Sequence, residues 1–153
     1  MNFASILSAV NLDGMTQVLD LEDDQKQTRA GATKGLGEQH GAQAEAALRT
    51  GNVSEALRLA EIAVQETPED ARAYNTHAMA FARKGDWESA ADDLAAAVAH
   101  DPMNAQWVFN RGIAYRNLGQ TGEAIRDFEK SLAMQPSPGL AAAAASELAK
   151  LRK

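Results

Sequence analysis

The chain has 153 residues, of which 45% are hydrophobic and 24% are charged, and its formal net charge is −6. This size suits one domain with a self-sufficient core, and the acidic charge argues against general binding to nucleic acid or to anionic membranes. The lack of cysteine excludes disulfides and thiolate chemistry. No apolar run approaches the roughly 20 residues of a membrane span, and residues 1–10 lack the positive start of a signal peptide, so we expect a cytoplasmic protein, with the periplasm as the alternative.

Residues 1–24 are predicted to form a short helical segment that is first apolar and then acidic. Four side chains at helical spacing share one face: Phe3, Ile6, Leu7 and Val10. We expect a break at residues 11–14, about one further helical turn, and then a run of carboxylates at residues 20–24. The apolar face has two interpretations, a cover for the exposed end of the helices that follow or a docking and self-association segment.

Residues 25–36 show no apolar periodicity and contain glycine, glutamine, lysine and threonine. Such a composition predicts a flexible linker. As a coil, about 12 residues span roughly 17–21 Å. We therefore expect the N-terminal segment to move freely on this linker.

Residues 37–136 repeat one pattern three times at an interval of 34 residues. Its markers are three glycines, three alanines and three prolines in constant register: Gly51, Gly85, Gly119, Ala56, Ala90, Ala124, Pro68, Pro102 and Pro136. In the third copy, apolar spacing predicts helices over residues 105–118 and 121–134. The glycine ends the first helix in a left-handed conformation, and the proline cannot extend the second. We therefore expect helix-turn-helix units at residues 37–70, 71–104 and 105–136.

The third copy resembles the tetratricopeptide repeat. The W-x2-L-G-x2-Y, A-x3-F and P pattern of that family is met by Gly112, Tyr115, Ala124, Phe128 and Pro136. Val108 and Arg111 depart from the pattern here, as His77 does in the second copy. The resemblance implies an all-α fold, an α-solenoid of antiparallel helix pairs stacked as a right-handed superhelix. Gly112 is expected where two helices cross too closely for a side chain.

Residues 137–153 are predicted to form a capping helix on the third unit. Ser137 suits the N-cap and Pro138 the first helical position. The helix then carries one apolar stripe, made of Leu140, Ala144, Leu148 and Leu151. This stripe would shield the apolar end of the repeat array from water.

The resemblance also implies that the first helix of each unit lines a concave groove. At the corresponding positions we predict a peptide-binding groove made of Arg49, Arg72, Asn75, Met79, Arg83, Phe109, Ile113, Arg116 and Asn117. Arginine holds carboxylates bidentately, asparagine suits a peptide backbone, and the apolar side chains provide a floor. We therefore expect a linear, acidic peptide as the partner. The alternative for Arg49, Arg83 and Arg116 is that they only stabilise the negative ends of their helices.

Co-chaperones of this family grip a carboxyl-terminal carboxylate with lysine, asparagine and arginine side chains. The corresponding positions in this chain are Gly41, Glu45, Thr76, Gln106 and Asn110. They do not match the clamp, which argues against the tail of a heat-shock chaperone as the ligand.

We predict no catalytic residues, no metal site and no cofactor. The three histidines, His40, His77 and His100, fall on different helices or faces, and no nucleophile stands with a base and an orienting group. The sequence therefore predicts a non-catalytic scaffold or adaptor, or a chaperone-like protein of secretion or assembly. The alternative is a structural unit that self-associates into a homo-oligomer through residues 1–24. In a third hypothesis, residues 1–24 fold back on their linker and occupy the groove as a pseudo-ligand.

Overall fold

The computed structural model describes the backbone of residues 12–153 and the side chains of residues 25–153. Within this range the regular elements are all helices: α2 (Leu12–Arg49), α3 (Val53–Glu66), α4 (Ala71–Lys84), α5 (Trp87–His100), α6 (Ala105–Asn117), α7 (Thr121–Ala133) and α8 (Pro138–Leu151). The chain divides into two compact units, one that reaches to Gly35 and one that runs from Leu36 to Lys153. The predicted all-α class is confirmed.

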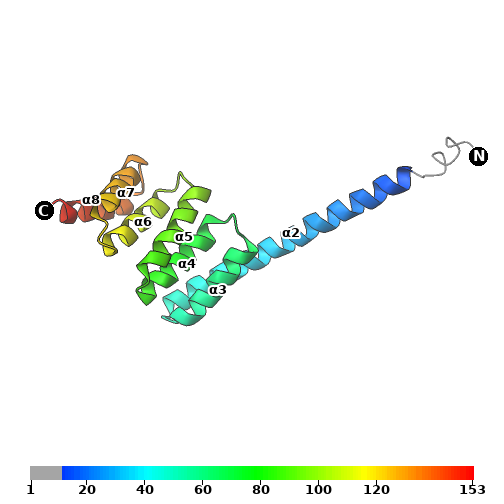
Figure 1. Cartoon of the computed structure of the whole chain (residues 1–153), viewed down its shortest axis with the longest axis horizontal. Helices are drawn as coiled ribbons and strands as arrows, with labels where there is room; N and C mark the ends of the chain where they lie inside the picture. The colour runs from blue at the N-terminus through cyan, green and yellow to red at the C-terminus, as the bar shows by residue number, and fades with distance from the viewer. Residues whose placement is uncertain (1–11) are drawn as a thin grey trace, which may run out of the picture. The chain divides into compact units, whose positions relative to one another are not determined.

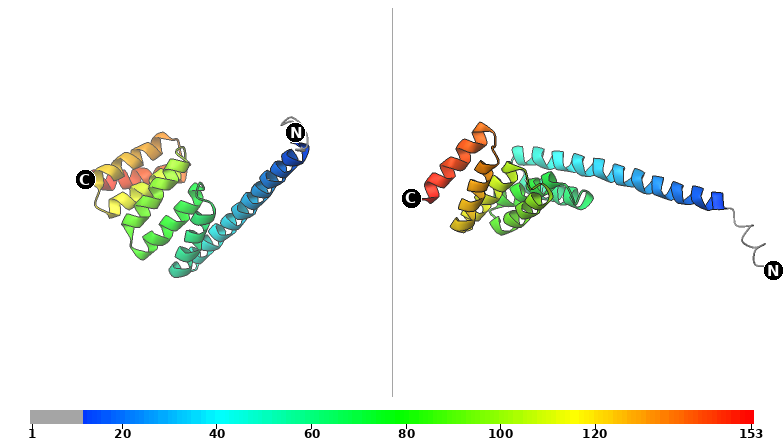
Figure 2. Two further views of the ribbon diagram at one scale, coloured as in Figure 1. Left: turned by 45° about the vertical axis from the view of Figure 1, so that its right-hand side comes forward. Right: turned by 90° about the horizontal axis from the view of Figure 1, so that it is seen from above.

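In the second unit the helices pack in chain order (Figure 1). α4 packs on α5 and α6 on α7, while α3 contacts α4, α5 contacts α6, and α8 contacts α7. Figure 2 shows the same succession from two further sides. From α3 to α8 each helix contacts the next in sequence, and the end of α2 shares two core clusters with α3. This is the arrangement of a solenoid of antiparallel helix pairs. The predicted architecture is therefore confirmed.

The turns inside the repeats have one geometry. Gly51, Gly85 and Gly119 have φ angles of +79°, +87° and +74°, a left-handed conformation that only glycine adopts without strain. The residue after each glycine donates its N–H to the carbonyl five residues earlier, at 2.9–3.0 Å. Asn52 and Asp86 then cap the next helix with their side chains. These local interactions explain why the glycines recur at a fixed interval.

The flexible linker predicted at residues 25–36 is wrong, because these residues lie inside the continuous helix α2. The break expected at residues 11–14 is also absent from residue 12 onward. The first proline of the chain is Pro68, and α2 already contains strong helix formers on both sides of Gly31 and Gly35. Extending an existing helix needs no new nucleus, so the cost of about 1 kcal/mol for each glycine does not stop it. The pseudo-ligand hypothesis required residues 25–36 to be a flexible coil that lets residues 1–24 fold back, and these residues are helical instead.

The close helix crossing predicted at Gly112 is present between α6 and α7. A Cβ atom at this position would lie 2.8 Å from the ring of Phe128, which is fully buried. Phe128 forms a core cluster with Ala124, Ala144 and Leu148. Glycine at one position and a large ring at the other therefore fill the same space between the two helices.

Two of the three departures from the repeat pattern, Arg111 and His77, each face a carboxylate at an equivalent position. Arg111 on α6 forms a fork with Asp127 on α7, at 2.7 and 2.9 Å, and Asp127 is only 5% exposed. In the second repeat, His77 Nδ1 lies 2.9 Å from Asp93 Oδ2. The two pairs are 34 residues apart in sequence. A polar pair has thus replaced an apolar contact in the same place twice.

The capping helix is confirmed. Ser137 stands at the N-cap of α8 and Pro138 in its first turn, although the Ser137 side chain makes no capping hydrogen bond. Ala144 and Leu148 are buried against α7, with Leu151 partly buried beside them. α8 therefore continues the core of the third repeat by one helix.

Candidate functional site

The structure brings five of the predicted groove positions into two pockets of the second unit, and the first of these pockets is basic. The final turns of α2 and the middle of α4 enclose a volume of about 210 Å³. We call it the arginine pocket, and it is lined by Glu45, Leu48, Arg49, Asn75, Thr76, Met79 and Arg83. Its predicted members are Arg49, Asn75, Met79 and Arg83. Leu48 is buried at the base, whereas Met79 is 43% exposed and stands at the rim.

The arginines of the groove differ in their partners. Arg72 forms a fork with Glu45, at 2.8 and 2.9 Å, and this hydrogen-bonded partner lowers the pKa of the Glu45 carboxyl. Arg49 and Arg83 are exposed, and neither side chain makes a hydrogen bond or an ion pair with the side chains that the structure describes. The two guanidinium groups that are available to a ligand therefore belong to the arginine pocket.

The third repeat contributes less to an open groove than predicted, because α8 engages several of its side chains. Arg116 donates to Glu147 of α8, which also accepts from Lys150 at 2.9 Å. Phe109 packs partly buried against the cluster of α7 and α8, with its ring 5.4 Å from that of Phe128. Ile113 touches the same cluster but also lines the second pocket. The usable surface thus ends near the boundary of the second and third repeats.

The two asparagines predicted to bind a peptide backbone have partners in the protein. Asn75 is 7% exposed, accepts from Asn110 at 2.7 Å and points its own amide toward Met79 Sδ at 3.5 Å. Asn117 donates to the Ile113 carbonyl at 2.8 Å. Their amides position α4, α6 and Met79, and a ligand would have to displace these bonds to use them.

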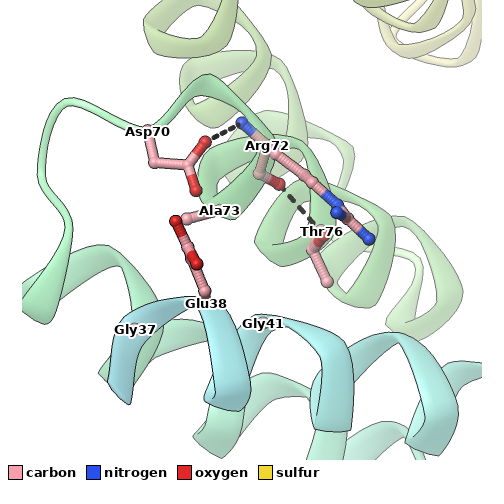
Figure 3. Close-up of a pocket in the computed structure, with 7 residues that line it drawn as sticks. All are labelled: Gly37, Glu38, Gly41, Asp70, Arg72, Ala73 and Thr76. Atoms are coloured by element: carbon pink, nitrogen blue, oxygen red, sulfur yellow. Dashed lines mark hydrogen bonds between the residues drawn. The ribbon is translucent and has the colours of Figure 1, made fainter. Parts of the chain in front are cut away.

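A small pocket lies beside the arginine pocket, between α2 and the start of α4 (Figure 3). Gly37 and Gly41 form one side of it, and Asp70 caps α4 by accepting from the Arg72 N–H at 2.9 Å. Its volume is about 40 Å³, which is little more than one water molecule occupies. This pocket is too small for a side chain of a ligand.

Sequence reasoning missed a second, apolar pocket between α4, α5 and α6. It encloses about 150 Å³ and includes Met79, Trp87, Leu94 and Ile113 in its wall. The signal was available in the sequence, because Leu94 stands where the third repeat has Phe128. We call it the Leu94 pocket.

The histidines have structural neighbours. His40 Nδ1 lies 2.6 Å from Glu66 Oε2, His77 faces Asp93, and His100 stacks on Tyr74 with ring centroids 5.4 Å apart. In the described part of the chain, no three histidine or acidic residues come together as a metal site would need. No described helix has the length and apolar character of a membrane span.

The predicted docking residues Phe3, Ile6, Leu7 and Val10 lie outside the described residues. Self-association through them stays a prediction.

Acid should weaken the attachment of α8 through Glu147. The hydrogen bond from Lys150, followed by that from Arg116, lowers the pKa of this carboxyl below its ordinary value. A carboxyl whose pKa is lower in the folded than in the unfolded protein stabilises the fold when the pH is above its unfolded-state pKa, near 4.5 for Glu147. This stabilisation is lost as the pH falls through the pKa of the folded protein. We expect Glu147→Gln to cost roughly 1–2 kcal/mol near neutral pH, with the difference from wild type shrinking below about pH 4. Urea unfolding at several pH values measures this, and a difference independent of pH would contradict it.

Comparison with known proteins agrees with this architecture. A model of the tetratricopeptide repeat matches residues 42–92 and 75–141. The tetratricopeptide repeat and J domain-containing co-chaperone DNJ1 of Fusarium oxysporum is 36% identical over 74 residues, which are 47% of this chain and 14% of that protein. Mouse sperm-associated antigen 1 is 29% identical over 128 residues, 84% of this chain and 13% of that protein. The chain thus spans about a seventh of the curated relatives it matches.

Among solved structures, the first repeat domain of Spaghetti (RPAP3), bound to the HSP90 peptide SRMEEVD, superposes with a TM-score of 0.73. The match covers 78% of this chain and 92% of that one, at 22% identity, and shows the shared fold. With a family model matching well over half of the residues, and with the repeat markers, turns and helix pairs in the places that the pattern requires, the chain belongs to the tetratricopeptide repeat family.

Proposed function

We propose that this protein is a non-catalytic adaptor that binds a linear, acidic peptide segment in the arginine pocket. The observation that carries the proposal is the pair of exposed guanidinium groups of Arg49 and Arg83 beside the apolar side chains of Leu48 and Met79. Neither guanidinium has a hydrogen-bond or ion-pair partner among the described side chains, although, besides the hydrogen bond from Arg72, the charge of Arg49 helps to lower the pKa of Glu45. The protein as a whole carries a net charge of −6, so a pocket with two available cations is a local exception. Carboxylates are the natural partners of such groups.

The arrangement suggests how the segment would be held. The two guanidinium groups bind carboxylate side chains, and Met79 adapts its flexible thioether to the adjoining apolar atoms. Arg72 contributes less, because Glu45 already occupies its fork. Binding consumes no cofactor and breaks no covalent bond, as expected of an adaptor.

The relatives support a peptide as the partner. The Spaghetti domain is bound to SRMEEVD, a peptide with three acidic residues. The clamp positions of this chain carry Gly41, Glu45, Thr76, Gln106 and Asn110, which provide no cation. We therefore propose that Arg49 and Arg83 bind acidic side chains along the segment. In this protein these side chains would serve as the main charged contact, instead of a carboxyl-terminal carboxylate. A chaperone-like role in secretion or assembly stays a prediction.

Fluorescence anisotropy with designed peptides tests the proposal. The peptides have a glycine-serine background with one leucine, and carry an increasing number of glutamates or, in a matched set, glutamines. We expect affinity to rise with glutamate content and to fall with added salt. Arg49→Gln and Arg83→Gln should each weaken binding about tenfold, the scale of one charged hydrogen bond.

Arg126→Gln is the matched control, because it removes the same charge from an exposed position on α7 outside the groove. It should leave the affinity unchanged. Equal affinity for the glutamate and glutamine peptides, or an equal loss in the control variant, would refute the proposed site.

A further inference from the structure

The Leu94 pocket is an opening in the core of the second repeat that reaches the surface. Ala90 and Leu94 form its floor and are 0% and 4% exposed, whereas Met79 at its rim is 43% exposed. Asn110 is the one polar side chain in a wall otherwise made of apolar residues. A pocket with an apolar floor and an accessible rim can receive an apolar group from solvent.

Comparison of the two repeats explains why the pocket exists. In the third repeat, the fully buried ring of Phe128 lies against Gly112 and fills the space between the helix pair. In the second repeat the equivalent residues are Leu94 and Ala78. Leucine lacks the ring, and the single methyl of alanine does not replace its volume. The Leu94 pocket is therefore the space that a phenylalanine ring fills in the third repeat.

The size of the pocket limits what enters. Its volume of about 150 Å³ matches apolar cavities that take up a molecule the size of benzene. One aliphatic side chain, or one phenyl ring, therefore fits. A longer apolar helix face does not, because the pocket is confined to α4, α5 and α6 and is bounded by Trp87 and Ile113.

The neighbouring charges identify the occupant. Met79 lines both the Leu94 pocket and the arginine pocket, so the two open side by side along α4. We propose that the Leu94 pocket takes one leucine-sized or phenyl-sized side chain of the same acidic segment. The recognition element is then an apolar anchor residue a few positions from a carboxylate that reaches Arg83 or Arg49. This inference rests on the proposed function, and it adds an apolar anchor residue to the acidic segment proposed there.

The anchor is tested with the same peptides, by comparing leucine with alanine at the single apolar position. The leucine peptide should bind the wild-type protein about tenfold to hundredfold more tightly, the scale of burying one such side chain. The double variant Ala78→Gly with Leu94→Phe recreates the Gly112–Phe128 pair, because a Cβ at the glycine position would lie 2.8 Å from the ring. It should fill the pocket and abolish this preference, while the glutamate dependence persists. Ala82→Leu, at the pocket wall where the third repeat carries Arg116, is a second variant with the same expected result. Leu132→Phe on α7, which lines neither pocket, should keep the preference.

A probe without charge separates this inference from the proposed function. Methyl NMR of the wild-type protein with N-acetyl-leucinamide should shift the methyl signals of Met79, Leu94 and Ile113, but not that of Met103, which is 79% exposed. The double variant Ala78→Gly with Leu94→Phe should remove the shifts of Met79 and Ile113. Glutamate-dependent binding with no leucine preference and no such shifts would overturn the anchor pocket and leave the adaptor proposal standing. Shifts with the leucine probe but no glutamate dependence of the peptides would overturn the acidic segment as the ligand, and with it both the adaptor proposal and the recognition element inferred from it.

Discussion

Asp127→Ala is expected to destabilise the protein by about 3 kcal/mol, because it leaves the guanidinium group of Arg111 largely buried without its partner. The Arg111 side chain is 19% exposed and that of Asp127 is 8% exposed, and both hydrogen bonds of the fork are lost together. Urea unfolding followed by circular dichroism measures the change in the free energy of unfolding.

The double variant Arg111→Leu with Asp127→Leu should recover most of that loss, since apolar residues of suitable volume replace a buried ion pair at little cost. Glu123→Ala is the control, because it removes the carboxylate of an exposed pair with Arg126 on the same helix. That variant should cost less than about 1 kcal/mol. Similar losses from Asp127→Ala and Glu123→Ala would show that the buried fork has no special role.

Phe128→Ala should cost about 3–5 kcal/mol, the range for deleting a large buried ring. Phe128 is fully buried and joins α7 to α8 through Ala144 and Leu148. Phe128→Leu should cost about 1–2 kcal/mol, since it leaves a space like that beside Leu94. Thermal and urea unfolding of both variants provide the comparison, and a loss below about 1 kcal/mol for Phe128→Ala would mean that the cluster collapses around the missing ring.

The fold was predictable because its determinants are local and repeated. Gly85 and Gly119 determine the turns and recur at the fixed interval of the repeat. Gly112 and Phe128 determine a helix crossing, and both match the sequence pattern of the repeat. Helix α2 was not predictable in the same way. Residues 25–36 are each exposed, so no apolar face marks them, and their helical state follows from continuity with the packed end of α2.

The candidate site was only partly predictable for a related reason. Helical position identifies which side chains of one helix share a face, as Met79 and Arg83 of α4 do, and the resemblance to the repeat assigned Arg49 of α2 to the same groove. All three line the arginine pocket. It does not reveal intramolecular partners that come from other helices. Glu45 for Arg72 and Glu147 for Arg116 are 27 and 31 residues away in sequence, and only packing brings them together.

Photo-crosslinking gives the most direct test of the central claim that an acidic segment binds in the groove beside α4. A glutamate-rich peptide with benzophenone next to its leucine is irradiated with the protein, and the modified residue is identified by mass spectrometry. Met79 is 43% exposed in the groove, whereas Met103 is 79% exposed outside both pockets and so reports collisions without binding. We expect the adduct on Met79, with a loss of this adduct in the variant that combines Arg49→Gln and Arg83→Gln. Adducts that favour Met103, or that persist in that variant, would contradict the account.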